Sequence, residues 1–285
     1  MGGVKSYLNN ANPTPTKASR QEQEIAQAPP FRYSSLWRGS VTQATSREWA
    51  TWGMAWGLGI LLALALGVVL PVMVITALKL ANVATLSQLT QGWPAVAYAG
   101  ETELSFGVAA GVAWAVATRH RWFDGTWRWR LWMKGLAGGL AFGAALTIVG
   151  VGLQYWLGHG LPSDTRDLVG PAGHHAGPFI ALLLIVALLA PFMEEWFFRG
   201  TLQTSLARVI GAPAAIGAVS LIFALAHEFD SPHPMAHPWI WAPILPLALV
   251  LGIVRVRTAS MSGNIGIHIG FNLWAAVLMA LQFWH

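Results

Sequence analysis

Apolar residues gather in seven long runs that follow a polar amino-terminal stretch. Most runs hold few charged residues and approach the ~20 residues that an α-helix needs to cross the hydrocarbon core of a bilayer. The runs lie at 53–78, 94–117, 131–157, 178–198, 213–227, 239–254 and 265–284. This pattern predicts an all-α fold, a polytopic membrane helical bundle of about seven to eight transmembrane helices.

Residues 1–48 have a different character. They are rich in Asn, Gln, Thr and Pro, carry scattered charge, and show no sustained apolar periodicity. Such a stretch buries too little apolar surface to offset the entropy of ordering its chain. We therefore expect a mostly disordered tail at 1–48 and a transmembrane domain at 49–285.

Composition agrees with a membrane protein. Of the 285 residues, 55% are hydrophobic and 10% are charged, and the mean hydropathy is +0.51. Soluble domains carry about 25% charged residues. The net charge of +5 is modest, and the basic residues follow a membrane topology and do not form a nucleic-acid patch. We therefore expect the lipid bilayer, and no nucleic acid, as a partner. The chain has no cysteine, which excludes disulfides and thiolate-bound metals.

The basic residues predict an orientation. With the amino terminus in the cytoplasm, 15 of the 17 Lys and Arg residues fall on the cytoplasmic side of the seven runs, and only Lys79 and Arg166 fall outside. Loops that stay in the cytoplasm carry an excess of Lys and Arg. We therefore predict a multi-pass protein of the cell membrane with a cytoplasmic amino terminus.

The fourth run ends in APFMEEWFFRG, which places two adjacent carboxylates in apolar sequence. Glu195 and Arg199 are four residues apart and share a helix face, so they can neutralise each other. Glu194 points about 100° away and has no obvious local partner, and such a carboxylate can act as a general base. The alternative is an interfacial charge cluster at a helix end.

Two later runs carry the remaining polar candidates. Phe223 and His227 are four apart in LIFALAHEF, and His268 and Asn272 are four apart in NIGIHIGFNLW. Hydrogen-bonding groups in an apolar helix can stabilise a developing oxyanion. The alternatives are a histidine that serves packing and a helix–helix hydrogen bond of the kind that joins membrane helices.

Together the three motifs resemble those of the CAAX-protease and bacteriocin-processing family of membrane-embedded glutamate proteases, also called the CPBP or ABI family, which includes type II CAAX prenyl endopeptidases. The resemblance covers residues 178–285, which we take as a protease-like core. Its motif residues are Glu194, Glu195, Arg199, Phe223, His227, His268 and Asn272.

The resemblance implies an intramembrane endopeptidase. Glu194 would activate water, His227 would help to position that water, and His268 with Asn272 would stabilise the oxyanion. The pair of Glu195 and Arg199 would orient the site. No cofactor is expected, although Glu194, His227 and His268 are also the ligand types of a two-histidine, one-carboxylate zinc site.

Other functions stay open on the sequence alone. Buried carboxylates also form proton or ion relays in transporters, and a non-catalytic scaffold or immunity protein of the same fold would keep these motifs. The expected partner is a peptide or protein substrate, including one that is membrane-associated or lipid-modified. The sequence does not select the substrate.

Overall fold

The computed structural model describes residues 92–117, 127–157, 175–229 and 241–283, together with a few single positions between residues 59 and 80. Every regular element in these residues is helical, which confirms the all-α fold class. The predicted tail at 1–48 lies outside the described residues. So does the first predicted span, at 53–78, apart from those single positions.

Five uninterrupted α-helices form much of the described chain. They are α6 (Trp93–Ala117), α7 (Trp129–Leu157), α12 (Ala212–Phe229), α13 (Trp241–Thr258) and α14 (Met261–Phe283). Their ends lie within four residues of the ends of five predicted apolar runs. Hydrophobic run length was therefore a good guide to helix position.

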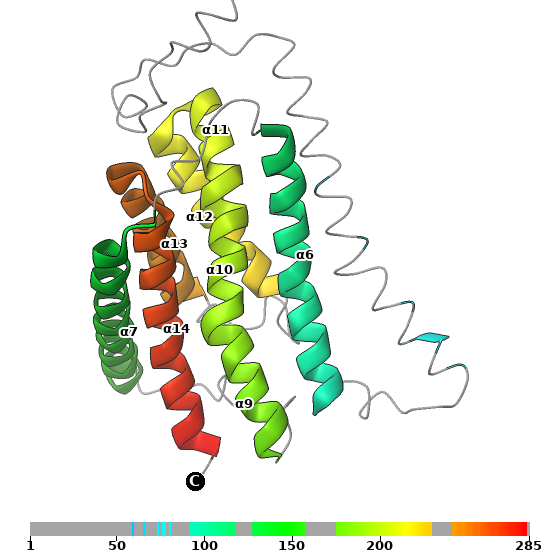
Figure 1. Ribbon diagram of the computed structural model, residues 1–285. Coiled ribbons are helices and arrows are strands. Elements are labelled where there is room, and N and C mark those ends of the chain that lie inside the picture. The colour runs from blue at the N-terminus through cyan, green and yellow to red at the C-terminus, as the bar shows by residue number, and fades with distance from the viewer. Residues whose placement is uncertain are drawn as a thin grey trace, which may run out of the picture. The chain divides into compact units, whose positions relative to one another are not determined.

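A longer rod joins five further segments without a break. It consists of α9 (Ala176–Leu184), η4 (Ile185–Leu189), α10 (Ala190–Glu194), η5 (Glu195–Leu202) and α11 (Gln203–Ile210). The two η segments are π-helical. We call residues 176–210 the central rod, and in Figure 1 it lies between α6 and α14.

Pro191 gives a physical reason for the first π-helical segment. Proline has no N–H, and its ring collides with the carbonyl four residues earlier, so a regular α-helix cannot pass through it unchanged. The π-helical turn η4 ends two residues before Pro191 and absorbs the irregularity. At the far end, Gly211 adopts φ +81° and separates the central rod from α12.

The predicted fourth span ended too early. We placed its end at residue 198, directly before Arg199. The helix continues to Ile210, and its Arg199 and Gln203 donate hydrogen bonds to the carbonyl oxygens of Ala248 and Gly252 in α13. A buried polar group with partners does not force a helix to end.

Three helices of the described residues are long and apolar enough to cross a membrane, namely Trp129–Leu153, Ala176–Ala207 and Met261–Leu281. A shorter apolar helix covers Ala212–His227. These helices identify a membrane protein, whereas the predicted count of seven to eight spans is not confirmed.

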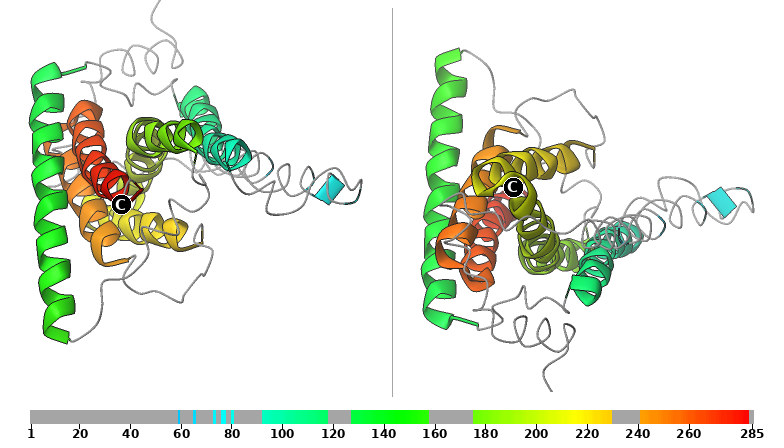
Figure 2. Two further views of the ribbon diagram at one scale, coloured as in Figure 1. Left: turned by 90° about the horizontal axis from the view of Figure 1, so that it is seen from below. Right: turned by 90° about the horizontal axis from the view of Figure 1, so that it is seen from above.

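Glycines bring α7 and α14 into backbone contact. A Cβ atom added to Gly135 or Gly139 of α7 would collide with the carbonyl oxygens of Gly263 or Ile267 of α14. Small residues allow this close approach between helices in membranes. Figure 2 shows α7 lying along the outer side of α14, which in turn packs against the central rod. This packing fixes the helix that carries His268.

Candidate active site

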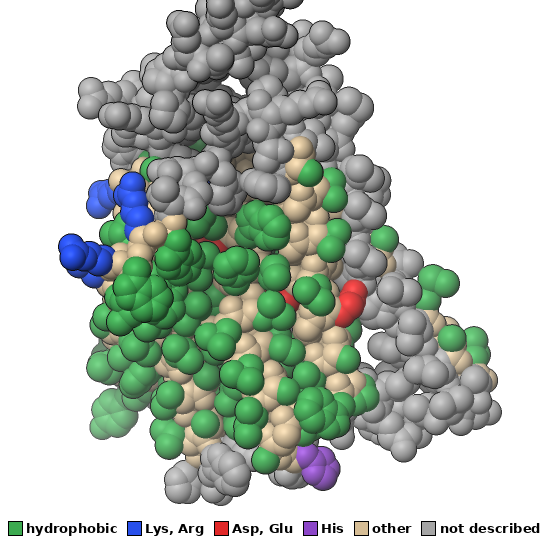
Figure 3. Space-filling view, in the orientation of Figure 1, with side chains coloured by type: hydrophobic (Ala, Val, Ile, Leu, Met, Phe, Trp, Pro, Cys, Tyr) green, Lys and Arg blue, Asp and Glu red, His purple; other side chains and the backbone are tan. Residues whose placement is uncertain are grey.

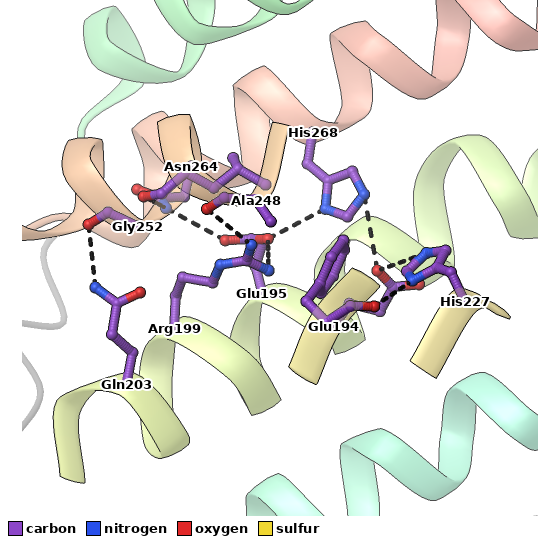
Figure 4. A network of polar contacts seen from close by, with 11 residues as sticks. Glu194, Glu195, Arg199, Gln203, His227, Ala248, Gly252, Asn264 and His268 are labelled. Carbon is purple, nitrogen blue, oxygen red and sulfur yellow. Dashed lines mark hydrogen bonds and ion pairs between the residues drawn. The ribbon is translucent and has the colours of Figure 1, made fainter. Parts of the chain in front are cut away.

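Glu194 and Glu195 sit at the junction of α10 and η5, and their carboxylates face different partners (Figure 4). Glu195 is fully buried, and Glu194 is 6% exposed. The two residues are adjacent in sequence but belong to different halves of one polar cluster. We call these halves the Glu195 side and the Glu194 side.

On the Glu195 side, three residues hold one carboxylate. Arg199 Nη1 donates to Glu195 Oε1 over 2.9 Å, and Asn264 Nδ2 donates to Oε2 over 3.2 Å. His268 Nδ1 lies 3.1 Å from Oε1. Since an ionised carboxylate only accepts hydrogen bonds, this Nδ1 carries a proton. Both oxygens of Glu195 are therefore satisfied from two helices.

Arg199 has contacts beyond this carboxylate. Its Nη2 donates to the carbonyl oxygen of Ala248 in α13 over 3.3 Å, and its guanidinium carbon lies 4.3 Å from the centroid of the Phe223 ring. A guanidinium over an aromatic face is a favourable cation–π arrangement. Arg199 is fully buried, so its charge is balanced by groups inside the protein.

Phe223 stands at the centre of the cluster. Its ring centroid is 4.5 Å from that of His227 and 5.7 Å from that of His268, and it packs edge-on against Phe198 at 5.0 Å. Phe223 is fully buried. This one ring therefore touches the guanidinium and both imidazoles, and it limits how far they can turn.

On the Glu194 side, two imidazoles face the second carboxylate. Glu194 Oε2 lies 3.7 Å from His268 Nε2 and 3.9 Å from His227 Nε2. These distances are too long for direct hydrogen bonds but suit one bridging water. Oε2 has no hydrogen-bond partner among the described residues. The His227 side chain is 30% exposed, so the cluster opens on this side.

Hydrogen bonding sets the tautomer of both histidines. His227 Nδ1 is 2.9 Å from the carbonyl oxygen of Phe223, which can only accept, so this nitrogen carries the proton. His268 Nδ1 donates to Glu195 in the same way. When the rings are neutral, each therefore turns an unprotonated Nε2 towards Glu194. That nitrogen can accept a hydrogen bond from water or bind a metal ion.

Asn272 lies one turn of α14 beyond His268 and is half-buried. Its Nδ2 donates to the carbonyl oxygen of Val186 over 2.8 Å. Val186 belongs to the π-helical segment η4, so this bond ties α14 to the irregular part of the central rod. One N–H of the Asn272 amide is used in this way, and the amide has two.

The structure thus brings together six of the seven predicted site residues, and the seventh, Asn272, lies next to them on α14. The six are Glu194, Glu195, Arg199, Phe223, His227 and His268. They come from the central rod, α12 and α14. Within the described residues, no group of three or more His, Asp or Glu side chains is arranged to hold a metal ion.

Sequence reasoning missed two members of the network. Asn264 is fully buried and bridges Glu195 to the carbonyl oxygen of Leu251, and Gln203 donates to the carbonyl oxygen of Gly252 over 3.0 Å. Both repeat the four-residue spacing of a known candidate: Asn264 precedes His268, and Gln203 follows Arg199. Extending each motif by one helical turn would have found them.

A comparison with known protein families finds a match to the part of the chain that contains this cluster. Residues 176–274 match the family model described as type II CAAX prenyl endopeptidase Rce1-like. The matched segment begins with α9 and ends within α14, and it includes every residue of the polar cluster. The match confirms the family resemblance over this part of the chain. No curated protein and no solved structure matches the chain.

Proposed function

We propose that the protein is a membrane-embedded endopeptidase in which Glu194 activates water to hydrolyse a peptide bond. The observation that carries this proposal is the contrast between two adjacent carboxylates. Glu195 has hydrogen bonds to both oxygens, whereas Glu194 Oε2 has none among the described residues and faces two imidazole nitrogens. The family match supports a protease in general terms.

The distances around Glu194 support water activation. A water that donates one hydrogen to Oε2 and the other to His227 Nε2 would satisfy both atoms, which are 3.9 Å apart. As the water oxygen attacks the carbonyl carbon of the substrate, its proton passes to Glu194. The protonated Glu194 then gives that proton to the amine that leaves when the C–N bond breaks.

His268 and Asn272 are proposed to donate hydrogen bonds to the oxyanion. Because His268 Nδ1 already donates to Glu195, its Nε2 can donate only if the ring is an imidazolium. The second N–H of Asn272 would be the other donor. Glu195, Arg199 and Phe223 would then act as positioning residues.

The family description directs the choice of substrate. It names CAAX prenyl endopeptidases, so a carboxyl-terminal tail with a prenylated cysteine is the first substrate class to test. The opening at His227 would admit the scissile bond. The transporter and non-catalytic alternatives gain no support from the family match.

The test is hydrolysis by the purified full-length protein in lipid nanodiscs. The substrates are synthetic prenylated tails and the same tails without the lipid, and mass spectrometry identifies the products. We expect cleavage that falls about 10²–10⁴-fold in the Glu194→Gln variant, because the amide keeps the size and loses the basicity.

The matched control is Glu101→Gln, which makes the same change at a half-buried carboxylate of α6, outside the cluster. It should retain wild-type activity. Undiminished turnover by Glu194→Gln would contradict the assignment of the base. If the wild type cleaves none of these tails, the proposed substrate class is wrong.

A further inference from the structure

A groove on the far side of α13 and α14 carries a second inference. It has a volume of about 320 Å³ and lies between α7, α13 and α14. Its walls are Leu131, Lys134, Gly135, Gly138, Phe142, Val250, Val254, Thr258, Gly263 and Ile267. Apart from Lys134 and Thr258, these residues are apolar or glycine.

The groove faces away from the polar cluster. Val250 and Val254 of α13 line the groove. They alternate along the helix with Ala248 and Gly252, whose carbonyl oxygens accept hydrogen bonds from the central rod. Likewise Ile267 of α14 lines the groove, while the next residue, His268, faces Glu195. A ligand in the groove would therefore touch neither Glu194 nor its imidazoles.

Cationic side chains gather at one end of this groove. Lys134 is exposed and belongs to its wall, and Arg130 lies one turn earlier on α7. Arg257 is exposed and adjoins Thr258 at the end of α13. A hydrogen bond of 3.2 Å from the Arg128 amide to Ser262 Oγ joins the starts of α7 and α14 at this level. Figure 3 shows Lys and Arg side chains clustered there.

We propose that this groove binds an anionic phospholipid, with the phosphate between Lys134 and Arg257. One acyl chain would lie against the glycine floor, which consists of Gly135, Gly138 and Gly263. An apolar trough that ends in exposed cations is complementary to a molecule with an apolar tail and an anionic head. Basic pockets between membrane helices bind acidic headgroups in this way. A zwitterionic lipid would fit the trough but gain less from the cations.

The glycine floor offers a way to close the groove without disturbing the helices. A Cβ atom at Gly138 would meet nothing within 4 Å, so a Leu side chain there would extend into the groove. Gly152 is an exposed glycine of the same helix with equally open surroundings, and it is not part of the groove. Gly152→Leu is therefore a matched control for Gly138→Leu.

The experiment is native mass spectrometry of the full-length protein with phosphatidylglycerol or phosphatidylcholine of identical acyl chains. We expect the wild type to retain phosphatidylglycerol at least about tenfold more strongly. The double variant Lys134→Gln/Arg257→Gln should lose that preference, and Lys134→Arg should keep it. Gly138→Leu should lose bound lipid, whereas Gly152→Leu should retain it.

Two results would overturn the inference. One is equal retention of both lipids by the wild type, which would mean that the cations do not select a headgroup. The other is equal retention by Gly138→Leu and Gly152→Leu, which would place the lipid elsewhere. Both results concern binding only, so they are independent of peptide hydrolysis.

Discussion

The Glu195 side and the Glu194 side of the cluster differ in how completely their polar atoms are satisfied. Glu195 and Arg199 are fully buried and bonded to residues of the central rod, α13 and α14. Glu194 Oε2 has no such partner within the described residues, and the nearby His227 side chain is 30% exposed. One side joins helices, whereas the other combines a buried oxygen that lacks a partner with a partly exposed histidine.

This difference reflects the cost of charge in an apolar interior. An ion pair buried away from water is tolerated only when additional hydrogen bonds satisfy its remaining atoms, as they do for Glu195. The resulting rigid support holds His268 by its Nδ1 and leaves its Nε2 facing Glu194. A fully buried ion pair thus orients the histidine beside it.

Removing the cation should produce the largest loss of stability. Arg199→Ala leaves Glu195 charged and buried without its ion-pair partner, and breaking such a pair costs about 3–5 kcal/mol. We expect a large decrease in the free energy of unfolding, measured by denaturant titration in detergent micelles. Arg257→Ala, at an exposed position on α13, is the control and should change little.

Replacing both members of the pair sharpens the same test. In the double variant Glu195→Leu/Arg199→Met no buried charge is left unpaired, so much of the stability should return. Activity should stay low, because His268 loses its acceptor. If Arg199→Ala is as stable as the wild type, the Glu195 side is not structural.

The oxyanion role of Asn272 predicts a loss of rate. Asn272→Ala should lower kcat by about 10²–10³-fold, the usual effect of removing one oxyanion donor, while KM changes little. Thr147→Val is the control. It removes a hydrogen bond from α7 to Trp274, which lies on α14 as Asn272 does. Equal effects of the two substitutions on kcat would make Asn272 a packing residue.

Asn264 should contribute less. Asn264→Ala removes a donor from Glu195 Oε2, and a buried acceptor left without its partner costs about 1–3 kcal/mol. We expect a lower unfolding temperature together with reduced activity, because Glu195 would hold His268 less firmly. Gln203→Leu, which breaks a bond to α13 without touching Glu195, should leave activity unchanged. Full activity in Asn264→Ala would contradict this link.

The smallest expected effect is that of a chelator. If Glu194 activates water directly, EDTA or phenanthroline should not change the rate, and bound metal should be well below one ion per chain. Elemental analysis alongside the assay measures both. Stoichiometric zinc that is lost with activity and restores it would make Glu194, His227 and His268 metal ligands instead.

Local patterns in the sequence predicted the parts of the site that depend on one helix. The spacing of Glu195 and Arg199 predicted their ion pair, which measures 2.9 Å. The apolar runs predicted five helices to within four residues at their ends. Both features depend on the period of one α-helix, which can be read from one segment of sequence.

Such patterns could not predict the features that depend on contacts between helices. His268 bonds Glu195 across 73 positions of sequence, and Asn264 bonds it across 69. The π-helical segments were not predicted either, although Pro191 was a visible reason for a local irregularity. The family resemblance linked the three motifs, six of whose residues lie together, but it did not indicate which nitrogen of each histidine faces Glu194.

The most direct test is to make one chemical change at both carboxylates. Glu194→Gln and Glu195→Gln, measured in the same nanodiscs, give an unfolding temperature and a rate of hydrolysis for each. We predict that Glu194→Gln keeps the wild-type unfolding temperature and loses activity, whereas Glu195→Gln loses both stability and activity. An active Glu194→Gln variant, or a Glu195→Gln variant as stable as the wild type, would contradict the account.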